Sequence, residues 1–207
     1  MLQNALLFAA RWQQLFLPDL TTTEDFTRAD GDAVGAQMMN GEFTVAYGEK
    51  DGYTAIALPY ASDFTAFFVL PPEGDAPTPD GVQAAIAAIG EQVRATVQIP
   101  SFDLKVTTDV KSFLEAQGVT ALFTDPASLS GIAEGAPVVS AITQQARLIV
   151  NESGTVGAAL TEIAMTTSLP PEPTHEFRAD RPFTMIVQHN DTGVHLFSAY
   201  IADPTAE

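Results

Sequence analysis

The sequence contains no cysteine, which excludes disulfide frameworks, thiolate metal sites and cysteine nucleophiles. Basic residues are also scarce, because nine Lys and Arg stand against 26 Asp and Glu and give a formal net charge of −17. Proteins bind nucleic acid largely by neutralising its phosphates with cations, so we expect neither nucleic acid nor an anionic membrane as a partner. The acidic residues are scattered along the chain, and we interpret them as a feature that keeps the protein soluble.

Long apolar runs and catalytic signatures are missing as well. No stretch approaches the roughly 18 continuous apolar residues of a membrane-spanning helix. The sequence has no Gly-x-Ser-x-Gly, Gly-x-Gly-x-x-Gly, P-loop or His-Glu-x-x-His motif. His189 and His195 flank one expected hairpin, where we interpret them as a cross-strand pair and not as metal ligands. We therefore expect no enzymatic activity, no metal and no cofactor.

The sequence does contain enough apolar residues for a core, since 46% of its 207 residues are hydrophobic. Alternation at period 2 and short apolar runs predict strands over residues 5–10, 42–47, 53–58, 65–70, 94–107, 138–150, 184–189 and 194–201. The stretch 18–32 is rich in Thr and Asp and is expected to be a surface connection. Short turns suit antiparallel hairpins, and no linker divides the chain, so we expect one domain.

Two segments show helical spacing of apolar residues. The first runs from Asp80 to Val93, and Asp80 is its expected N-cap. The second is expected from Asp109 to Gln117, with Thr108 as its N-cap. The residues expected to point inward on this second helix are Val110, Phe113 and Leu114.

The segment from Glu152 to Leu169 is unusual, because its 18 residues include no Pro, Lys or Arg. An ordinary surface loop would be shorter and more polar. Alternate residues from Thr155 to Met165 carry no charge, which is a strand pattern with one face able to be buried, although two prolines follow and stop any ladder. Two interpretations stay open: a segment that serves as both loop and strand, or a plain edge strand followed by a Pro-rich turn.

Short blocks of sequence occur in a fixed order along the whole chain. They are Asn4-Ala5 to Phe8, Trp12, Phe16, Met38-Met39, Leu58-Pro59-Tyr60, Leu129-Ser130-Gly131, Val150-Asn151-Glu152-Ser153-Gly154-Thr155 and Phe177-Arg178-Ala179-Asp180-Arg181-Pro182-Phe183. Together they resemble the serpins, and the last two blocks are specific to that family. The resemblance implies the C-terminal portion of the serpin fold, which is α+β with mostly antiparallel sheets, a few helices and a long reactive-centre loop. The match begins inside the third strand of the family's main sheet.

The resemblance implies that residues 152–176 are the reactive-centre loop, which a target serine protease cleaves while it becomes bound in a covalent acyl complex. The hinge of this loop would consist of Glu152, Gly154, Thr155, Val156, Gly157, Ala158, Ala159, Leu160 and Thr161. The cleaved bond is either Thr167–Ser168, from matching of the Ser-Leu-Pro-Pro-Glu block, or Ser168–Leu169, from counting along the hinge. In both cases the acyl residue is small and neutral, which favours elastase-like or subtilisin-like proteases over trypsin-like ones.

The resemblance also implies a sheet-opening region at Asn4, Trp12 and Gln144. Gln144 replaces a His that is usual in the family, so this position cannot titrate near neutral pH. Small and uncharged inward residues in the hinge favour an inhibitor, because a charge buried without a partner costs several kcal/mol. The family further implies a secreted, extracellular protein.

Two other interpretations stay open: a non-inhibitory serpin-fold protein with a binding or structural role, and an inactive truncated fragment. The helices and two main-sheet strands that come first in the family do not precede the match in this chain. Apolar side chains such as Leu7 and Phe8 are therefore expected to face water, and exposed patches of this kind drive association. We expect the isolated chain to self-associate, or to need a complementing N-terminal fragment.

Overall fold

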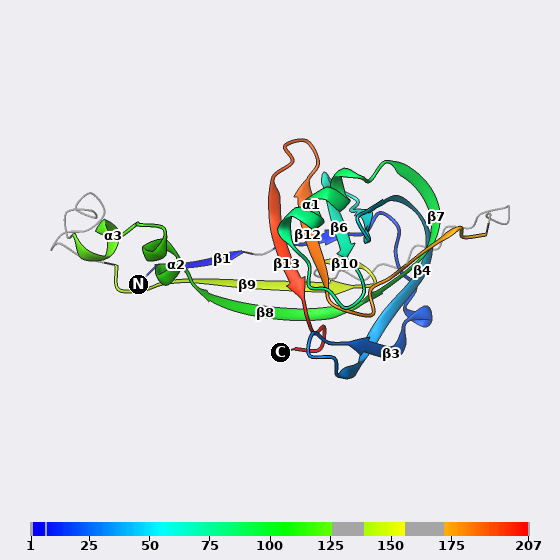
Figure 1. The fold of residues 1–207 in the computed structure, drawn as a ribbon, viewed down its shortest axis with the longest axis horizontal. Helices are drawn as coiled ribbons and strands as arrows, with labels where there is room; N and C mark the ends of the chain where they lie inside the picture. The colour runs from blue at the N-terminus through cyan, green and yellow to red at the C-terminus, as the bar shows by residue number, and fades with distance from the viewer. Residues whose placement is uncertain (1, 7, 126–138, 156–171, 207) are drawn as a thin grey trace. The chain divides into compact units, whose positions relative to one another are not determined.

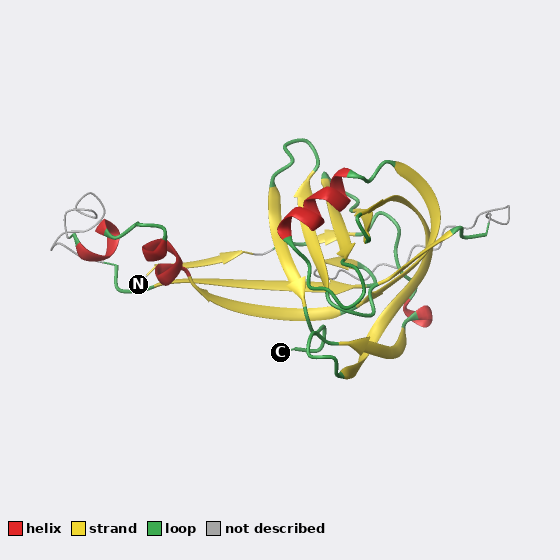
Figure 2. Cartoon of the chain, viewed as in Figure 1, coloured by secondary structure: helices red, strands yellow, loops and turns green. Residues whose placement is uncertain are grey.

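The computed structural model of the protein describes residues 2–6, 8–125, 139–155 and 172–206 (Figure 1). The chain forms two compact units, one of Met1–Leu7 with Leu104–Leu148 and the other of Phe8–Asp103 with Ile149–Glu207. Strands make up most of the described chain and helices are few (Figure 2). Among the described residues, no helix has the length and apolarity to cross a membrane.

The larger unit is built on a sheet with the strand order β11-β7-β4-β5-β6-β12-β13, and β3 pairs with β4 beside it. Its strands are β3 (Thr22–Thr27), β4 (Ala33–Lys50), β5 (Tyr53–Pro59), β6 (Phe64–Leu70), β7 (Glu91–Pro100), β11 (His175–Arg178), β12 (Phe183–His189) and β13 (His195–Ile201). All neighbours run antiparallel except β11 and β7. Asp51 and Gly52 join β4 to β5 with positive φ angles of 51° and 81°, as a tight hairpin turn requires.

Helix α1 (Pro79–Ala87) lies over β5 and β6 of this sheet (Figure 1). Its Val82 and Ala85, three residues apart on one face, are buried in a cluster with Tyr53 and Val69 of the sheet. Burial of such apolar side chains contributes roughly 25 cal/mol per Å² of area removed from water. This packing holds the helix on the sheet.

The first predicted helix differs from α1 in its cap and in its end. The Thr78 hydroxyl accepts a hydrogen bond from the backbone N–H of Gly81 at 3.2 Å, so Thr78 and not Asp80 is the N-cap. Asp80 lies in the first turn, where its negative charge interacts favourably with the positive end of the helix dipole. The helix ends at Ala87 instead of Val93, because residues 91–93 pair with β4 as the start of β7.

The expected surface connection over residues 18–32 is wrong. This stretch contains a 3-10 turn at Pro18–Leu20 and strand β3, which pairs with β4 along its whole length. Phe26 of β3 is fully buried. The burial of this ring outweighs the low strand propensity of the polar residues around it.

The single long strand predicted over residues 94–107 is two strands in different sheets. β7 ends at Pro100, and β8 (Phe102–Asp109) begins after Ser101 and pairs with a strand of the other sheet. Pro100 is paired with Met38, and Ser101 N still donates to the Gln37 carbonyl of β4 at 2.8 Å before the chain leaves this sheet. The chain changes sheets just after the proline that the sequence had indicated as a bend.

The second sheet has the strand order β1-β9-β10-β2, and β8 also pairs with β9. Its strands besides β8 are β1 (Leu2–Leu6), β2 (Ala10–Arg11), β9 (Ile142–Asn151) and β10 (Gly154–Thr155). β1 and β9 run parallel within the smaller unit, and Asn4 lies opposite Gln144 in their register. The run predicted over residues 5–10 is thus divided between β1 and β2.

The smaller unit also holds two short helices, α2 (Val110–Ala116) and α3 (Ala121–Thr124). The carboxylate of Asp109 accepts a hydrogen bond from Lys111 N at 3.0 Å and caps α2, so the predicted cap at Thr108 is wrong. Val110 and Leu114 are partly buried, but Phe113 is 62% exposed. The expected inward position of Phe113 is therefore wrong, and among the three predicted residues only Val110 and Leu114, which lie four residues apart on one face, are partly shielded.

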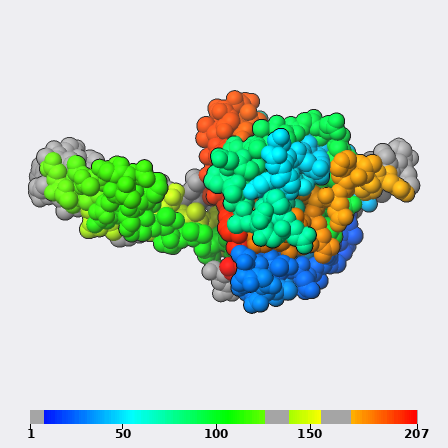
Figure 3. Space-filling model, in the orientation of Figure 1, coloured from blue at the N-terminus to red at the C-terminus, as the bar shows by residue number. Residues whose placement is uncertain are grey.

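The predicted hairpin near the C-terminus is confirmed. Residues 190–193 turn between β12 and β13 and stand out from the surface of the larger unit (orange-red in Figure 3). Gly193 has a φ of 68°, and its N–H donates to the His189 carbonyl at 2.9 Å. His195 lies opposite Gln188 in the register, and the His189 ring bonds to Thr192, so the expected cross-strand pair of His189 and His195 is wrong.

The close approach of β4 to the end of α1 predicts a measurable effect of Gly48→Ala. A Cβ at this position would lie 2.6 Å from Ile89 N and 2.7 Å from the carbonyl carbon of Ala88, and these backbone atoms cannot rotate away. We expect the free energy of unfolding to fall by about 1–3 kcal/mol, the usual cost of overpacking, in urea unfolding followed by circular dichroism.

Gly90→Ala is the matched control for this substitution, since a Cβ there would meet nothing closer than the Ala88 carbonyl oxygen at 4.0 Å. Equal unfolding midpoints for the two variants would contradict the packing of α1 against β4.

Candidate functional site

Two residues of the predicted hinge form a strand between two other strands. Gly154 and Thr155 make up β10, which pairs antiparallel with β2 on one side and with β9 on the other. Thr155 lies opposite Ala10 of β2 and opposite Val150 of β9. The beginning of the unusual uncharged segment is therefore inside a sheet. The predicted hinge residues 156–161 lie outside the described residues, as do both candidate bonds for cleavage at 167–169.

A tight turn connects β9 to β10. The side-chain oxygen of Asn151 accepts hydrogen bonds from Ser153 N at 3.0 Å and from Gly154 N at 3.2 Å. Gly154 has a φ of 148°, and a Cβ at this position would overlap the carbonyl oxygen of Ala10. Glycine is thus required here both by its backbone conformation and by the close approach of β2.

The side chain of Thr155 is buried beneath an aromatic pair. Its residue is 1% exposed, and its hydroxyl lies 2.7 Å from the Tyr60 hydroxyl. The ring of Tyr60 stacks on the indole of Trp12, with centroids 4.4 Å apart and planes 10° apart. Burial raises the pKa of Tyr60, and the hydrogen bond with Thr155 opposes this shift only in part, so the phenol stays protonated at neutral pH.

Trp12 is bonded to the same turn from the other side. Its indole Nε1 donates to the Asn151 carbonyl at 2.9 Å, and its backbone N–H donates to the Ser153 carbonyl at 3.0 Å. The residue is 2% exposed, so these bonds are shielded from water. The structure places Trp12 where the hinge begins; its part in sheet opening stays a prediction.

Glu152 is also tied to its surroundings. Its carboxylate accepts a hydrogen bond from the Thr21 hydroxyl at 2.7 Å, and its backbone carbonyl accepts one from Phe16 N at 3.1 Å. Thr21 immediately precedes β3, so these bonds connect the hinge to the segment that leads into the larger sheet. The negative charge therefore lies on the partly exposed side of the turn, away from the buried side chain of Thr155.

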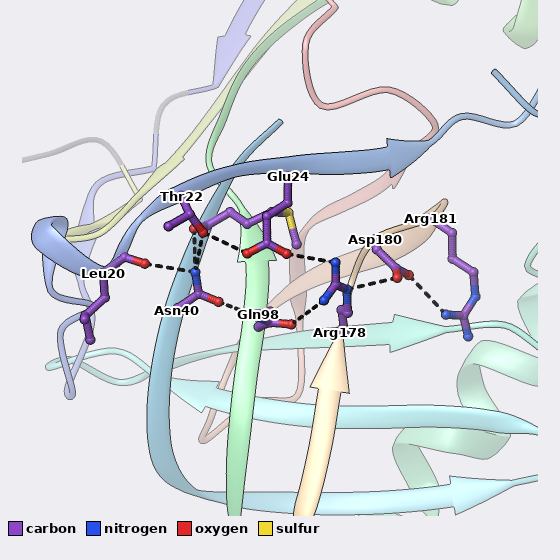
Figure 4. A network of polar contacts seen from close by, with 9 residues as sticks. Leu20, Thr22, Glu24, Asn40, Gln98, Arg178, Asp180 and Arg181 are labelled. Carbon is purple, nitrogen blue, oxygen red and sulfur yellow. Dashed lines mark hydrogen bonds and ion pairs between the residues drawn. The ribbon is translucent and has the colours of Figure 1, made fainter. Parts of the chain in front are cut away.

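The far end of the predicted loop is held by a polar network on β11 (Figure 4). The Arg178 guanidinium donates to Glu24 at 2.8 Å, to Asp180 at 3.0 Å and to Gln98 at 3.2 Å. Gln98 in turn donates to Asn40 at 2.6 Å. The Arg178 side chain thereby connects β11 to β3, to β7 and to the turn that follows β11. These bonds help to hold β11 beside β7.

Sequence reasoning did not assign several of these roles. Tyr60, Arg178 and Asp180 were noticed only as parts of recognisable blocks, and Thr21 was not noticed at all. Arg178, for example, bonds to Gln98, which is 80 residues away in sequence, and to Glu24, which is 154 residues away. No local sequence pattern could reveal such partners. Within the described parts of the chain, no group of His, Cys, Asp and Glu could hold a metal ion.

Residues 1–204 match the family model described as serpin (serine protease inhibitor). The chain belongs to the serpin family. It is 33% identical to alpha-1-antiproteinase 2 of Equus caballus over 214 residues, which covers 99% of this chain and 50% of that protein. This serpin chain therefore spans about half the length of its curated relative.

Solved structures agree with this assignment. A highly specific serpin of the insect Tenebrio molitor, Serpin48, superposes with a TM-score of 0.80 at 28% identity, and the match covers 97% of this chain and 55% of the other. A serpin from the trematode Schistosoma haematobium has a TM-score of 0.81 at 24% identity, with 98% and 56% covered, and shows the same fold. The expected serpin fold, with mostly antiparallel sheets and few helices, is confirmed.

The steric role of Gly154 in this serpin predicts that Gly154→Ala displaces β10. The added Cβ would overlap the Ala10 carbonyl, and alanine disfavours the positive φ. The sequence has one Trp, and its indole bonds to this turn, so the emission of Trp12 reports the change. We expect the emission maximum to move to longer wavelength as the indole meets water.

Ser153→Ala is the control for this experiment, because the bond that Ser153 makes with Trp12 uses the backbone carbonyl. An emission spectrum of Gly154→Ala that equals that of the control would show that β10 tolerates a side chain at this position.

Proposed function

We propose that the protein to which this chain belongs inhibits a serine protease as a suicide substrate. The observation that carries the proposal is the position of Thr155, which already lies in a strand between β2 and β9 with its side chain buried. A loop whose first residues are seated in this way would enter the sheet by extending that strand, once β1 and β9, which pair with each other, have separated. Family membership supports protease inhibition in general.

The proposed chemistry uses the protease's own mechanism. The protease serine attacks the carbonyl carbon of Thr167, or of Ser168 in the alternative assignment, and the peptide bond to the next residue breaks. An ester then joins the serine Oγ to the loop, and the new amino terminus leaves. Water would normally hydrolyse this ester. Insertion of the loop as a continuation of β10 draws the protease away and deforms it before hydrolysis.

The residue types of the hinge support rapid insertion. If the strand continued past Thr155, every second residue would share its inward face, and these residues are Gly157, Ala159 and Thr161. None carries a charge, so insertion would bury no unpaired ion. Gly157 adds backbone entropy that ordering must remove, and Leu160 is bulky, but neither blocks a strand. An inhibitor is thus favoured over a non-inhibitory binding protein.

The proposed partner is an elastase-like or subtilisin-like serine protease outside the cell. A small neutral residue on the acyl side fits the small or permissive specificity pockets of such enzymes. Trypsin-like enzymes need a cation in that pocket, and neither Thr167 nor Ser168 supplies one. In this proposal the protein is secreted and has no enzymatic activity of its own.

We further propose that the 207-residue chain alone does not inhibit. The expectation that Phe8 faces water is wrong, because its ring contacts the rings of Tyr60, Phe64 and Phe197, and Leu7 lies outside the described residues. In the smaller unit, however, Val106 is 57% exposed and Phe113 is 62% exposed. Exposed apolar groups of this size are typical of surfaces that another segment or molecule covers. A complementing N-terminal half, or a second copy of the chain, would cover them.

Covalent trapping tests the proposed function. The chain is fused behind the N-terminal half of the horse alpha-1-antiproteinase 2 and mixed with an elastase-like or a subtilisin-like protease. We expect a protease complex that survives boiling in detergent, whereas the unfused chain gives none and elutes from a sizing column as an oligomer or aggregate. A trypsin-like protease serves as the negative control. A cleaved loop with the protease left fully active would falsify the inhibitory function.

Thr155→Arg in the same fusion tests the assigned register. The side chain at 155 is buried, so a guanidinium there meets no water and insertion should slow on the order of 100-fold, the equivalent of a few kcal/mol for an unpaired buried charge. We expect the protein to become a substrate that is cut without complex formation. Thr174→Arg adds the same charge at an exposed position and should still trap protease. Unchanged trapping by Thr155→Arg would mean that the register is wrong.

A further inference from the structure

The hydroxyl groups of Tyr60 and Thr155 meet inside the larger unit. Tyr60 is 3% exposed and Thr155 is 1% exposed, and their oxygens lie 2.7 Å apart. Among the described residues, Thr155 is the hydrogen-bond partner found for this hydroxyl. A buried hydroxyl is stable only when it is hydrogen-bonded, so each of the two groups depends on the other.

The position of the Tyr60 hydroxyl is set independently of Thr155. Stacking on Trp12 fixes the plane of the Tyr60 ring, and the Trp12 indole is itself bonded to the Asn151 carbonyl. The backbone of Tyr60 is held by a bond from its N–H to the Phe64 carbonyl at 3.0 Å. Tyr60 therefore presents its hydroxyl at a fixed point, whether or not the hinge is in place.

We propose that Tyr60 is a positioning residue that recognises a hydroxyl group at position 155 and thereby fixes which hinge residue enters the sheet first. If Thr155 leaves, the Tyr60 hydroxyl loses this partner, and the lost hydrogen bond favours re-entry of the hinge. The consequence for protease trapping rests on the proposed function. The recognition itself does not, because it concerns two side chains of the uncleaved protein.

The sequence around Thr155 gives this recognition its specificity. The residues directly before and after it are Gly154 and Val156, and neither carries a hydroxyl group. A slip of one residue in either direction would also turn the inward face of the strand outward. Only the observed register gives the Tyr60 hydroxyl a partner without moving the turn at Gly154.

A double-mutant cycle on the full chain tests the inference. Tyr60→Phe and Thr155→Val each remove one hydroxyl while keeping the shape of the side chain. We expect each single variant to raise the hydrogen-exchange rate of the Thr155 amide about tenfold, because it leaves one buried hydroxyl unpaired. The double variant leaves none, and its rate should return to within about threefold of the parent.

Packing alone predicts a different result. If Tyr60 acted only through its ring, Tyr60→Phe would leave the exchange rate unchanged. If the two hydroxyls acted independently, the double variant would exchange about 100-fold faster than the parent, the product of two tenfold effects. Either result would overturn the proposal.

Thr155→Ser keeps the hydroxyl and removes a methyl group, so it serves as the matched control. Its exchange rate should stay within about threefold of the parent, the range expected when the coupling is preserved. Near-ultraviolet circular dichroism shows whether Thr155→Val folds. If it does not fold, Thr155→Ser still tests the proposal, because a tenfold rise in its exchange rate would overturn the proposal.

The exchange measurement needs no protease and so separates the two proposals. Coupling between the hydroxyls in a protein that traps no protease would reject the proposed function and keep the inference. Trapping without coupling would reject the inference alone.

Discussion

The two-residue strand β10 is the constraint on which the rest of the site depends. Gly154 and Thr155 fill the space between β2 and β9, so that neither of these strands presents an unpaired edge at this point. The carbonyl of Asn151, at the start of the turn before β10, accepts the hydrogen bond from the Trp12 indole. The hydroxyl of Thr155 in β10 is the hydrogen-bond partner of the Tyr60 hydroxyl. Removal of β10 would leave the Tyr60 phenol without its partner Thr155 and would leave β2 and β9 unpaired at this point.

Charge is absent from the buried side of the site, and this decides its response to pH. The Tyr60 phenol has a raised pKa and stays neutral, and Gln144 on β9 does not titrate at all. Glu152, the nearby acid, has its carboxylate on the partly exposed side, against the Thr21 hydroxyl. The buried side of the hinge is therefore held by packing and by a hydrogen bond between two neutral hydroxyl groups.

Sequence alone predicts the parts of this protein whose signals are local. The strands over residues 53–58 and 65–70 and the turn at residues 190–193 were predicted correctly, because alternation and turn residues act over a few positions. Strand β3 was missed, since it is specified by the burial of Phe26 and by pairing with β4 and not by its own polar residues.

The candidate site shows the same limit. The alternation that begins at Thr155 indicated that the hinge can be a strand, and β10 starts there. The partner that receives Thr155 is 95 residues away in sequence, at Tyr60, and no spacing rule joins them. The N-caps of the two predicted helices were wrong by only one or two residues. Thr78 and Asp109 each lie within two residues of another side chain that can cap a helix, so the sequence offers two candidates at each end.

The two ends of the loop are held by different interactions, and this difference suits the proposed mechanism. At the far end, β11 pairs with β7 over four residue positions, and the partly exposed Arg178 adds several polar bonds. Ion pairs exposed to water are individually weak, about 0–1 kcal/mol, so the ladder carries most of this attachment. It remains whole when the bond before it is cut.

At the near end the strand has only two residues, but both are buried and paired on both sides. In the proposed mechanism cleavage releases the chain after this point, and insertion lengthens a strand whose register and direction are already set. The entropy of bringing the hinge to the sheet has been lost before the protease arrives. Once β1 and β9 separate, each further residue would add its pairing on both sides without a new search, which is what a reaction in competition with hydrolysis of the acyl ester requires.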